Sequence, residues 1–168
     1  MSVLFAATYP ERVSHLILMS CFSRSADRSS DEAWQVRLEQ IVKNWGAGEM
    51  LKTVAPGEAG TPASVAQFGR YERLASSPGA LRTLLQLNRQ IDVAAILPTL
   101  HVPTPVLHSK ADLQVPVELG RKIAAAIPGV KYIEYPTGDH AFWTGNNDAK
   151  IGDNEEFVTG HRDHGADE

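Results

Sequence analysis

The chain has 168 residues, of which 43% are hydrophobic, and it carries a formal net charge of −4 at pH 7. This length and apolar content suit one globular domain, and the charge disfavours nucleic acid and anionic membranes as partners. Cys21 is the only cysteine, so an intrachain disulfide is excluded and we expect a cytoplasmic protein. Residues 1–7 lack the pattern of a signal peptide, and no apolar run approaches the roughly 20 residues that span a bilayer.

The first segment has the pattern of a helix followed by a strand. Residues 1–9 are small and apolar and end at Pro10, which predicts the last turns of a helix. Residues 13–19 form a short apolar run with little alternation, as in a parallel strand that is covered on both faces. We therefore assign residues 1–22 to an α/β core.

A long insertion, residues 23–99, shows helical patterns and no convincing strand. One helix is predicted from Asp31, as its N-terminal cap, to about Trp45. Two more are predicted to begin near Thr61 and at Ser77, and glycines and prolines between them indicate loops. We interpret this insertion as a helical cap on the sheet.

The α/β pattern returns after the insertion. Strands are predicted at residues 104–108 and 130–135, and a helix over residues 117–127 joins them. A strand, a helix and a strand of these lengths form a βαβ unit. Residues 100–160 thus complete the core, and residues 161–168 form a polar tail. The predicted fold is α/β, with about three parallel strands, flanking helices and a helical cap.

Two polar residues follow neighbouring predicted strands. Asp112 closes the segment after residues 104–108, and His140 closes the segment after residues 130–135. Adjacent parallel strands end at the same edge of a sheet, so these side chains are expected to meet. A histidine that transfers protons needs a carboxylate at Nδ1 to fix its tautomer. Asp112 and His140 are therefore candidate acid and base of a Ser-His-Asp triad; the alternatives are a helix-capping turn aspartate and a loop histidine.

A nucleophile is not evident, because no Gly-x-Ser-x-Gly motif occurs between Met1 and Glu168. Ser20 and Cys21 follow the first strand, but nothing in the sequence exposes either side chain as a nucleophile. We expect both to line a substrate pocket. Three aromatic residues are candidates for the same pocket: Trp34, Phe68 and Trp143. The alternative for Trp34 and Phe68 is the core of the helical cap.

Other polar residues are given structural roles. Asp139 adjoins His140, but adjacent side chains diverge, so Asp139 is expected to serve the turn. His108 lies on a predicted buried strand and is expected to be a structural residue with satisfied hydrogen bonds. His161 and His164 have the spacing of helical metal ligands, but a third ligand is missing from this polar tail. We predict neither a metal nor a cofactor.

Several motifs occur in a characteristic order: Pro10-Glu11-Arg12-Val13 before an apolar strand, residues 102–108 followed by Asp112 and Val115-Pro116, and Gly138-Asp139-His140. Together they resemble the C-terminal half of α/β-hydrolase-fold enzymes, in which the acid precedes the histidine. The resemblance covers nearly the whole chain. Residues 143–145 and 155–160 are more narrowly similar to actinobacterial hydrolase domains, some of which precede class III nucleotide cyclase domains.

The resemblance implies a nucleophile elbow immediately before a segment similar to residues 1–10. A serine there would attack a small ester or a related substrate, with His140 as the base and Asp112 as its partner. An aspartate there would instead indicate an epoxide hydrolase or a dehalogenase.

We hypothesise that this chain is a fragment or a late-start product that has negligible activity alone. By family analogy the strand at residues 13–19 lacks one neighbour, and its open edge is expected to promote self-association or pairing with a missing N-terminal half. Two alternatives stay open: a non-catalytic module that binds a small molecule or regulates, and a truncated remnant with an interaction role.

Overall fold

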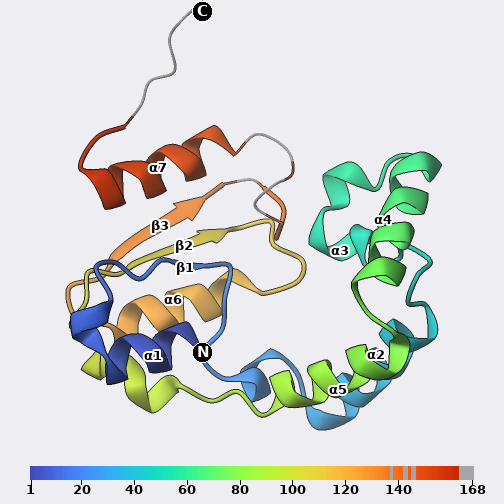
Figure 1. Cartoon of the computed structure of the whole chain (residues 1–168), viewed down its shortest axis with the longest axis horizontal. Helices are drawn as coiled ribbons and strands as arrows, with labels where there is room; N and C mark the ends of the chain where they lie inside the picture. Colours follow the sequence, from blue (N-terminus) through green and yellow to red (C-terminus); the bar gives the residue numbers. More distant parts are fainter. Residues whose placement is uncertain (137, 142–143, 145–146, 163–168) are drawn as a thin grey trace, which may run out of the picture.

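The computed structural model describes residues 1–136, 138–141, 144 and 147–162. Its centre is a parallel sheet of three strands in the order β1 (Leu18–Met19), β2 (Pro105–Ser109) and β3 (Lys131–Tyr135) (Figure 1). All five residues of β2 are buried, as expected for the middle strand of a covered sheet. The predicted class, α/β with about three parallel strands, is confirmed.

The first strand is shorter than the predicted run of residues 13–19. Only Leu18–Met19 form a regular ladder with β2. Single backbone hydrogen bonds extend the contact at both ends, from Leu16 N to Pro103 O (3.0 Å) and from Ser20 N to Leu107 O (3.0 Å). The apolar run therefore follows β2, but its first residues lie outside the ladder, and hydrophobicity alone does not reveal where pairing begins.

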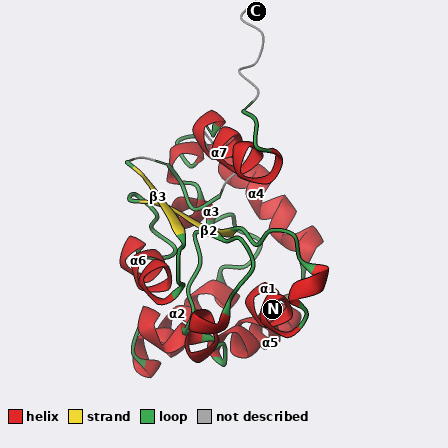
Figure 2. Ribbon diagram, turned by 90° about the vertical axis from the view of Figure 1, so that its left-hand side faces the viewer, coloured by secondary structure: helices red, strands yellow, loops and turns green. Residues whose placement is uncertain are grey.

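Helices cover both faces of the sheet. In Figures 1 and 2, α7 (Asp148–Thr159) lies on one face, while α1 (Ser2–Thr8) and α6 (Val117–Ala126) lie on the other. The main hydrophobic core fills the layer between the sheet and this second pair. It contains Val3 and Ala6 of α1, Leu18 of β1, Val106 of β2, Ile123 of α6, and Leu97 of the short 3₁₀ helix η4 (Ala94–Thr99).

The residues between β1 and β2 are mainly helical. They form η2 (Ser25–Arg28), α2 (Asp31–Lys43), α3 (Leu51–Val54), η3 (Pro56–Glu58), α4 (Pro62–Ala75), α5 (Pro78–Arg89) and η4. In Figure 1, α3 and α4 stand apart from the sheet, and α2 runs beside α5. Their assignment to a separate cap domain stays a prediction.

The caps of these helices follow local sequence chemistry. α4 and α5 begin where predicted, and Thr61 and Ser77 accept hydrogen bonds from backbone N–H groups in their first turns. The predicted cap of α2 is wrong, because Ser30 caps that helix by accepting from Ala33 N at 3.2 Å. Asp31 is the first helical residue, and its carboxylate pairs with Arg89. Among the described residues, no helix is long and apolar enough to span a membrane.

Candidate active site

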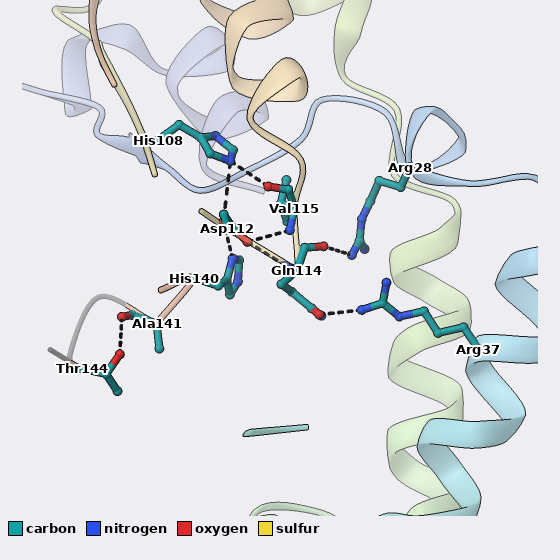
Figure 3. A network of polar contacts seen from close by, with 9 residues as sticks. All are labelled: Arg28, Arg37, His108, Asp112, Gln114, Val115, His140, Ala141 and Thr144. Atoms are coloured by element: carbon teal, nitrogen blue, oxygen red, sulfur yellow. Dashed lines mark hydrogen bonds and ion pairs between the residues drawn. The ribbon is translucent and has the colours of Figure 1, made fainter. Parts of the chain in front are cut away.

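The carboxyl ends of β2 and β3 bring Asp112 and His140 together. His140 Nδ1 lies 2.9 Å from Asp112 Oδ2, and Figure 3 shows the two side chains facing each other. The Asp112 side chain is fully buried, whereas the His140 side chain is 28% exposed. Because an ionised carboxylate only accepts hydrogen bonds, Nδ1 donates and carries the proton. The tautomer of His140 is thereby set, with Nε2 as the basic nitrogen.

The second oxygen of Asp112 holds the turn after β2. Oδ1 accepts from the backbone N–H groups of Gln114 and Val115, each at 2.8 Å. Burial raises the pKa of Asp112, but hydrogen bonds from His140 and from these two amides outweigh it and leave the pKa below its ordinary value. Asp112 is thus both a turn residue and the hydrogen-bond partner of His140, but it does not cap α6, whose N-cap residue is Pro116.

A cavity of about 420 Å³ lies beside His140. Ser20 and Cys21, which follow β1, line it together with His140, so residues after all three strands converge there. Ser20 has a left-handed backbone (φ 47°), which a non-glycine residue seldom adopts. Burial raises the pKa of the Cys21 thiol to about 12, so this thiol is no ready nucleophile near neutral pH.

Solved structures share this arrangement of strands and helices. The chain superposes on the enol-lactonase from Burkholderia xenovorans with a TM-score of 0.75 at 22% sequence identity, over 94% of this chain and 61% of that one. A hydrolase from Pseudomonas aeruginosa matches with a TM-score of 0.71 at 20% identity, over 94% and 60%. A lipase-esterase related protein from Clostridium acetobutylicum matches with a TM-score of 0.70 at 16% identity, over 93% and 60%.

The chain has part of the α/β-hydrolase fold. It spans about three fifths of the length of these three structures, which agrees with the predicted resemblance to a portion of that fold. No protein-family model and no curated protein sequence matches it. The likeness therefore rests on the arrangement of strands and helices, and the narrower similarity to actinobacterial hydrolase domains stays a prediction.

A second histidine lies behind Asp112. His108 on β2 is fully buried; its Nε2 lies 2.9 Å from Val115 O and 3.6 Å from Asp112 Oδ2. Its Nδ1 has no hydrogen-bond partner within the described residues. His108 is thus buried as expected, but only one of its two ring nitrogens is satisfied. The sequence pattern placed His108 on the strand but did not reveal that its side chain contacts Val115, in the turn of residues 112–115 (the acid turn).

The aromatic residues assigned to the pocket lie elsewhere. Trp34 lines a smaller neighbouring cavity of about 130 Å³ beside α2, and Phe68 lines another cavity near Ala141. Neither lines the His140 cavity. Trp143 lies outside the described residues.

Sequence reasoning overlooked Arg28, which lines the His140 cavity and has no motif that marks it. The structure also shows what Asp139 contacts: its Oδ2 accepts from Thr144 Oγ1 at 3.1 Å, and His140 Nδ1 turns to Asp112 instead. Within the described residues, no group of three or more His, Cys, Asp or Glu side chains is arranged to hold a metal ion. His164 falls outside those residues, so the spacing that it forms with His161 is not tested.

Proposed function

We propose that this chain supplies the acid and the base of a hydrolase that cleaves a small ester or a related substrate. The observation that carries the proposal is the 2.9 Å hydrogen bond between His140 Nδ1 and the buried Asp112 carboxylate. It prepares Nε2 to take a proton, and the partly exposed imidazole lines a cavity of a size that suits a small ligand.

The proton path follows from this geometry. His140 Nε2 accepts the proton of the attacking group and returns it to the leaving group. The Asp112 carboxylate holds the ring in place and stabilises the imidazolium between these two steps. Asp112 Oδ2 also lies 3.6 Å from His108 Nε2, beyond hydrogen-bond distance, so among the described residues its hydrogen bond goes to His140.

The nucleophile and the oxyanion hole are proposed to come from residues outside this sequence, because no Gly-x-Ser-x-Gly motif occurs within it. Met1, Ser2 and Val3 line the same cavity as His140. A residue joined to the N-terminal end of α1 would therefore lie beside the base. A serine there gives an acyl-enzyme, whereas an aspartate gives an alkyl-enzyme intermediate that His140 helps water to hydrolyse.

One measurement tests the acid and base separately from the nucleophile. Long-range ¹H–¹⁵N spectra of the imidazoles are expected to show His140 as the Nδ1–H tautomer, and Asp112→Ala is expected to abolish that preference. Exposed His101 serves as the internal reference. An unchanged His140 spectrum in Asp112→Ala would contradict the pairing.

Hydrolysis of p-nitrophenyl butyrate tests the chemistry. We expect negligible turnover by these 168 residues, and turnover by a chain extended with an in-frame upstream Gly-x-Ser-x-Gly segment. His140→Ala should then lower kcat of the extended chain by at least about 10³-fold, while His101→Ala leaves it unchanged. Turnover by the 168-residue chain that vanishes in His140→Ala would place a nucleophile inside this sequence. Ligand binding without turnover by the extended chain would favour a non-catalytic binding module.

A further inference from the structure

The His140 cavity contains a guanidinium that has no carboxylate partner. Arg28, at the end of η2, lines this cavity and also the smaller one beside α2. No described residue that lines the His140 cavity is an aspartate or a glutamate. By contrast, the surface arginines Arg24, Arg82 and Arg121 each contact a carboxylate. In the described part of the chain, Arg28 has no such ion pair and its Nε has no hydrogen-bond partner.

The surroundings of Arg28 add positive charge. Burial, followed by the charge of Arg37, lowers the pKa of Arg28 from its ordinary value, and Arg89 acts in the same direction. Asp112 opposes this shift, but its carboxylate is already occupied by His140 and by two backbone amides. Since arginine stays protonated in proteins, the charge persists in a partly dry pocket, where an anion is favoured.

Arg28 is held in place rather than free to reach the solvent. Its Nη2 donates to Gln114 O at 2.9 Å, and its guanidinium carbon lies 4.9 Å from the centre of the Phe22 ring. Arg37 Nη2 donates to Gln114 Oε1 at 2.5 Å, so both arginines converge on the residue that also donates its N–H to Asp112 (Figure 3).

The segment that carries Arg28 is fixed as well. Arg89 donates to Ser25 O at 2.9 Å and to Ser29 O at 3.0 Å, which pins both ends of η2. The guanidinium is therefore a preorganised part of the cavity wall, and a ligand does not have to order it.

We infer that the cavity takes a small molecule with a carboxylate group, which Arg28 binds while the scissile ester faces His140. Apolar side chains of Leu18, Leu85, Leu97 and Ile123 also line the cavity, which suits a short carbon chain. Guanidinium and carboxylate form strong, charge-assisted hydrogen bonds. The position of the ester rests on the proposed function, whereas the binding of the carboxylate by Arg28 does not.

A pair of ligands that differ in one charge tests this inference on the 168-residue chain itself. Monomethyl glutarate carries a carboxylate and an ester, and dimethyl glutarate carries two esters and no charge. We expect the monoester to bind at least about tenfold more tightly at low ionic strength, measured by calorimetry and by ¹H–¹⁵N spectra. The Arg28 Nε–H resonance should shift with the monoester and stay unchanged with the diester.

Variants assign the preference to one side chain. Arg28→Met, which keeps much of the stem but removes the charge, should abolish the preference, and Arg28→Lys should keep part of it. Arg82→Gln is the matched control, because it removes an exposed arginine that pairs with Glu39 and lines none of the described cavities. If Arg28→Met fails to fold, the Arg28 resonance in the unmodified chain decides the question.

Equal affinity for both ligands, no saturable binding of the monoester, or an unchanged preference in a folded Arg28→Met variant would overturn the inference. The imidazole spectra described above, recorded on the same samples, report on the acid and base independently. A retained charge preference without the His140–Asp112 tautomer signal would contradict the proposed function alone, and the reverse result would contradict only the carboxylate site.

Discussion

Asp112 combines a structural and a chemical task in one side chain. One carboxylate oxygen holds the turn through two backbone amides, and the other orients His140. These contacts keep the pKa of Asp112 below its ordinary value despite its burial. The ionised carboxylate therefore stabilises the folded state, and acid should remove that contribution.

The isosteric change Asp112→Asn tests this linkage. A folded-state pKa that lies below the unfolded value gives stability that is present above roughly pH 4 and is lost as the pH falls through the folded-state pKa. We expect the variant to lower the free energy of unfolding by about 1–3 kcal/mol at pH 7, because a buried charge-assisted hydrogen bond is lost. Urea unfolding from pH 7 to pH 3 should show the difference shrinking on the acidic side.

Asp27→Asn is the control for that series, since exposed Asp27 pairs with Lys122 at the surface. Such surface pairs contribute little, so its effect should be small at every pH. A penalty for Asp112→Asn that stays constant down to pH 3 would show that the carboxylate charge does not stabilise the fold.

The candidate acid and base were predictable at the residue scale because their positions follow from chain order. Each comes a few residues after an apolar run, and parallel pairing converts that order into proximity. His108 and Arg28 were not predictable in this way. His108 meets Val115 across a turn, and Arg28 reaches Gln114 across a separation of 86 residues. No local pattern encodes either contact.

At the scale of elements, β2 and α6 fit together because Gly120 has no side chain. A Cβ at Gly120 would lie 2.4 Å from His108 Nδ1 and 2.9 Å from its Cγ. The helix thus approaches the strand closely enough to bury the imidazole, which in turn holds Val115 at the end of the acid turn. The packing of one helix therefore supports the geometry of the site.

Gly120→Ala should disturb this packing. The added methyl group must displace the His108 ring, and we expect the free energy of unfolding to fall by about 1–3 kcal/mol in urea titrations, as for other overpacked cores. The imidazole spectrum of His140 should change as well, because the acid turn loses its support.

Gly79→Ala is the matched control on another helix, α5, where a Cβ would meet nothing within 4 Å. Its stability should be unchanged or slightly higher, because alanine favours helix over glycine. Equal effects of the two substitutions would mean that the contact with His108 does not limit the packing of α6.

At the scale of the whole molecule, the sheet has one unpaired side. Within the described residues, β1 pairs with β2 and has no strand on its other edge. Apolar side chains of the N-terminal segment are exposed, namely Leu4 (45%), Phe5 (41%), Tyr9 (45%) and Ile17 (36%). We propose that the chain self-associates through this edge and these side chains, since open apolar edges recruit partners.

Size-exclusion chromatography with light scattering is expected to show dimers or larger species of the isolated chain. Ile17→Lys should shift the population toward the monomer, because a charge beside an edge strand discourages pairing. Val36→Lys, on the exposed face of α2, should leave the distribution unchanged. A stable monomer at micromolar concentration would refute the proposal.

The α/β class, the strand-helix-strand unit and the order of acid and histidine follow from the amino-acid sequence alone. These depend on short-range signals: apolar runs, capping residues such as Thr61 and Ser77, and turn residues. Three features emerge only from the packing of the folded chain: the short stretch of residues 13–19 that pairs as a strand, the positions of Trp34 and Phe68, and the place of Arg28 in the wall of the His140 cavity. Strand and helix patterns can be recognised within a few consecutive residues. Burial and side-chain contacts cannot, because they depend on packing between segments that are far apart in the chain.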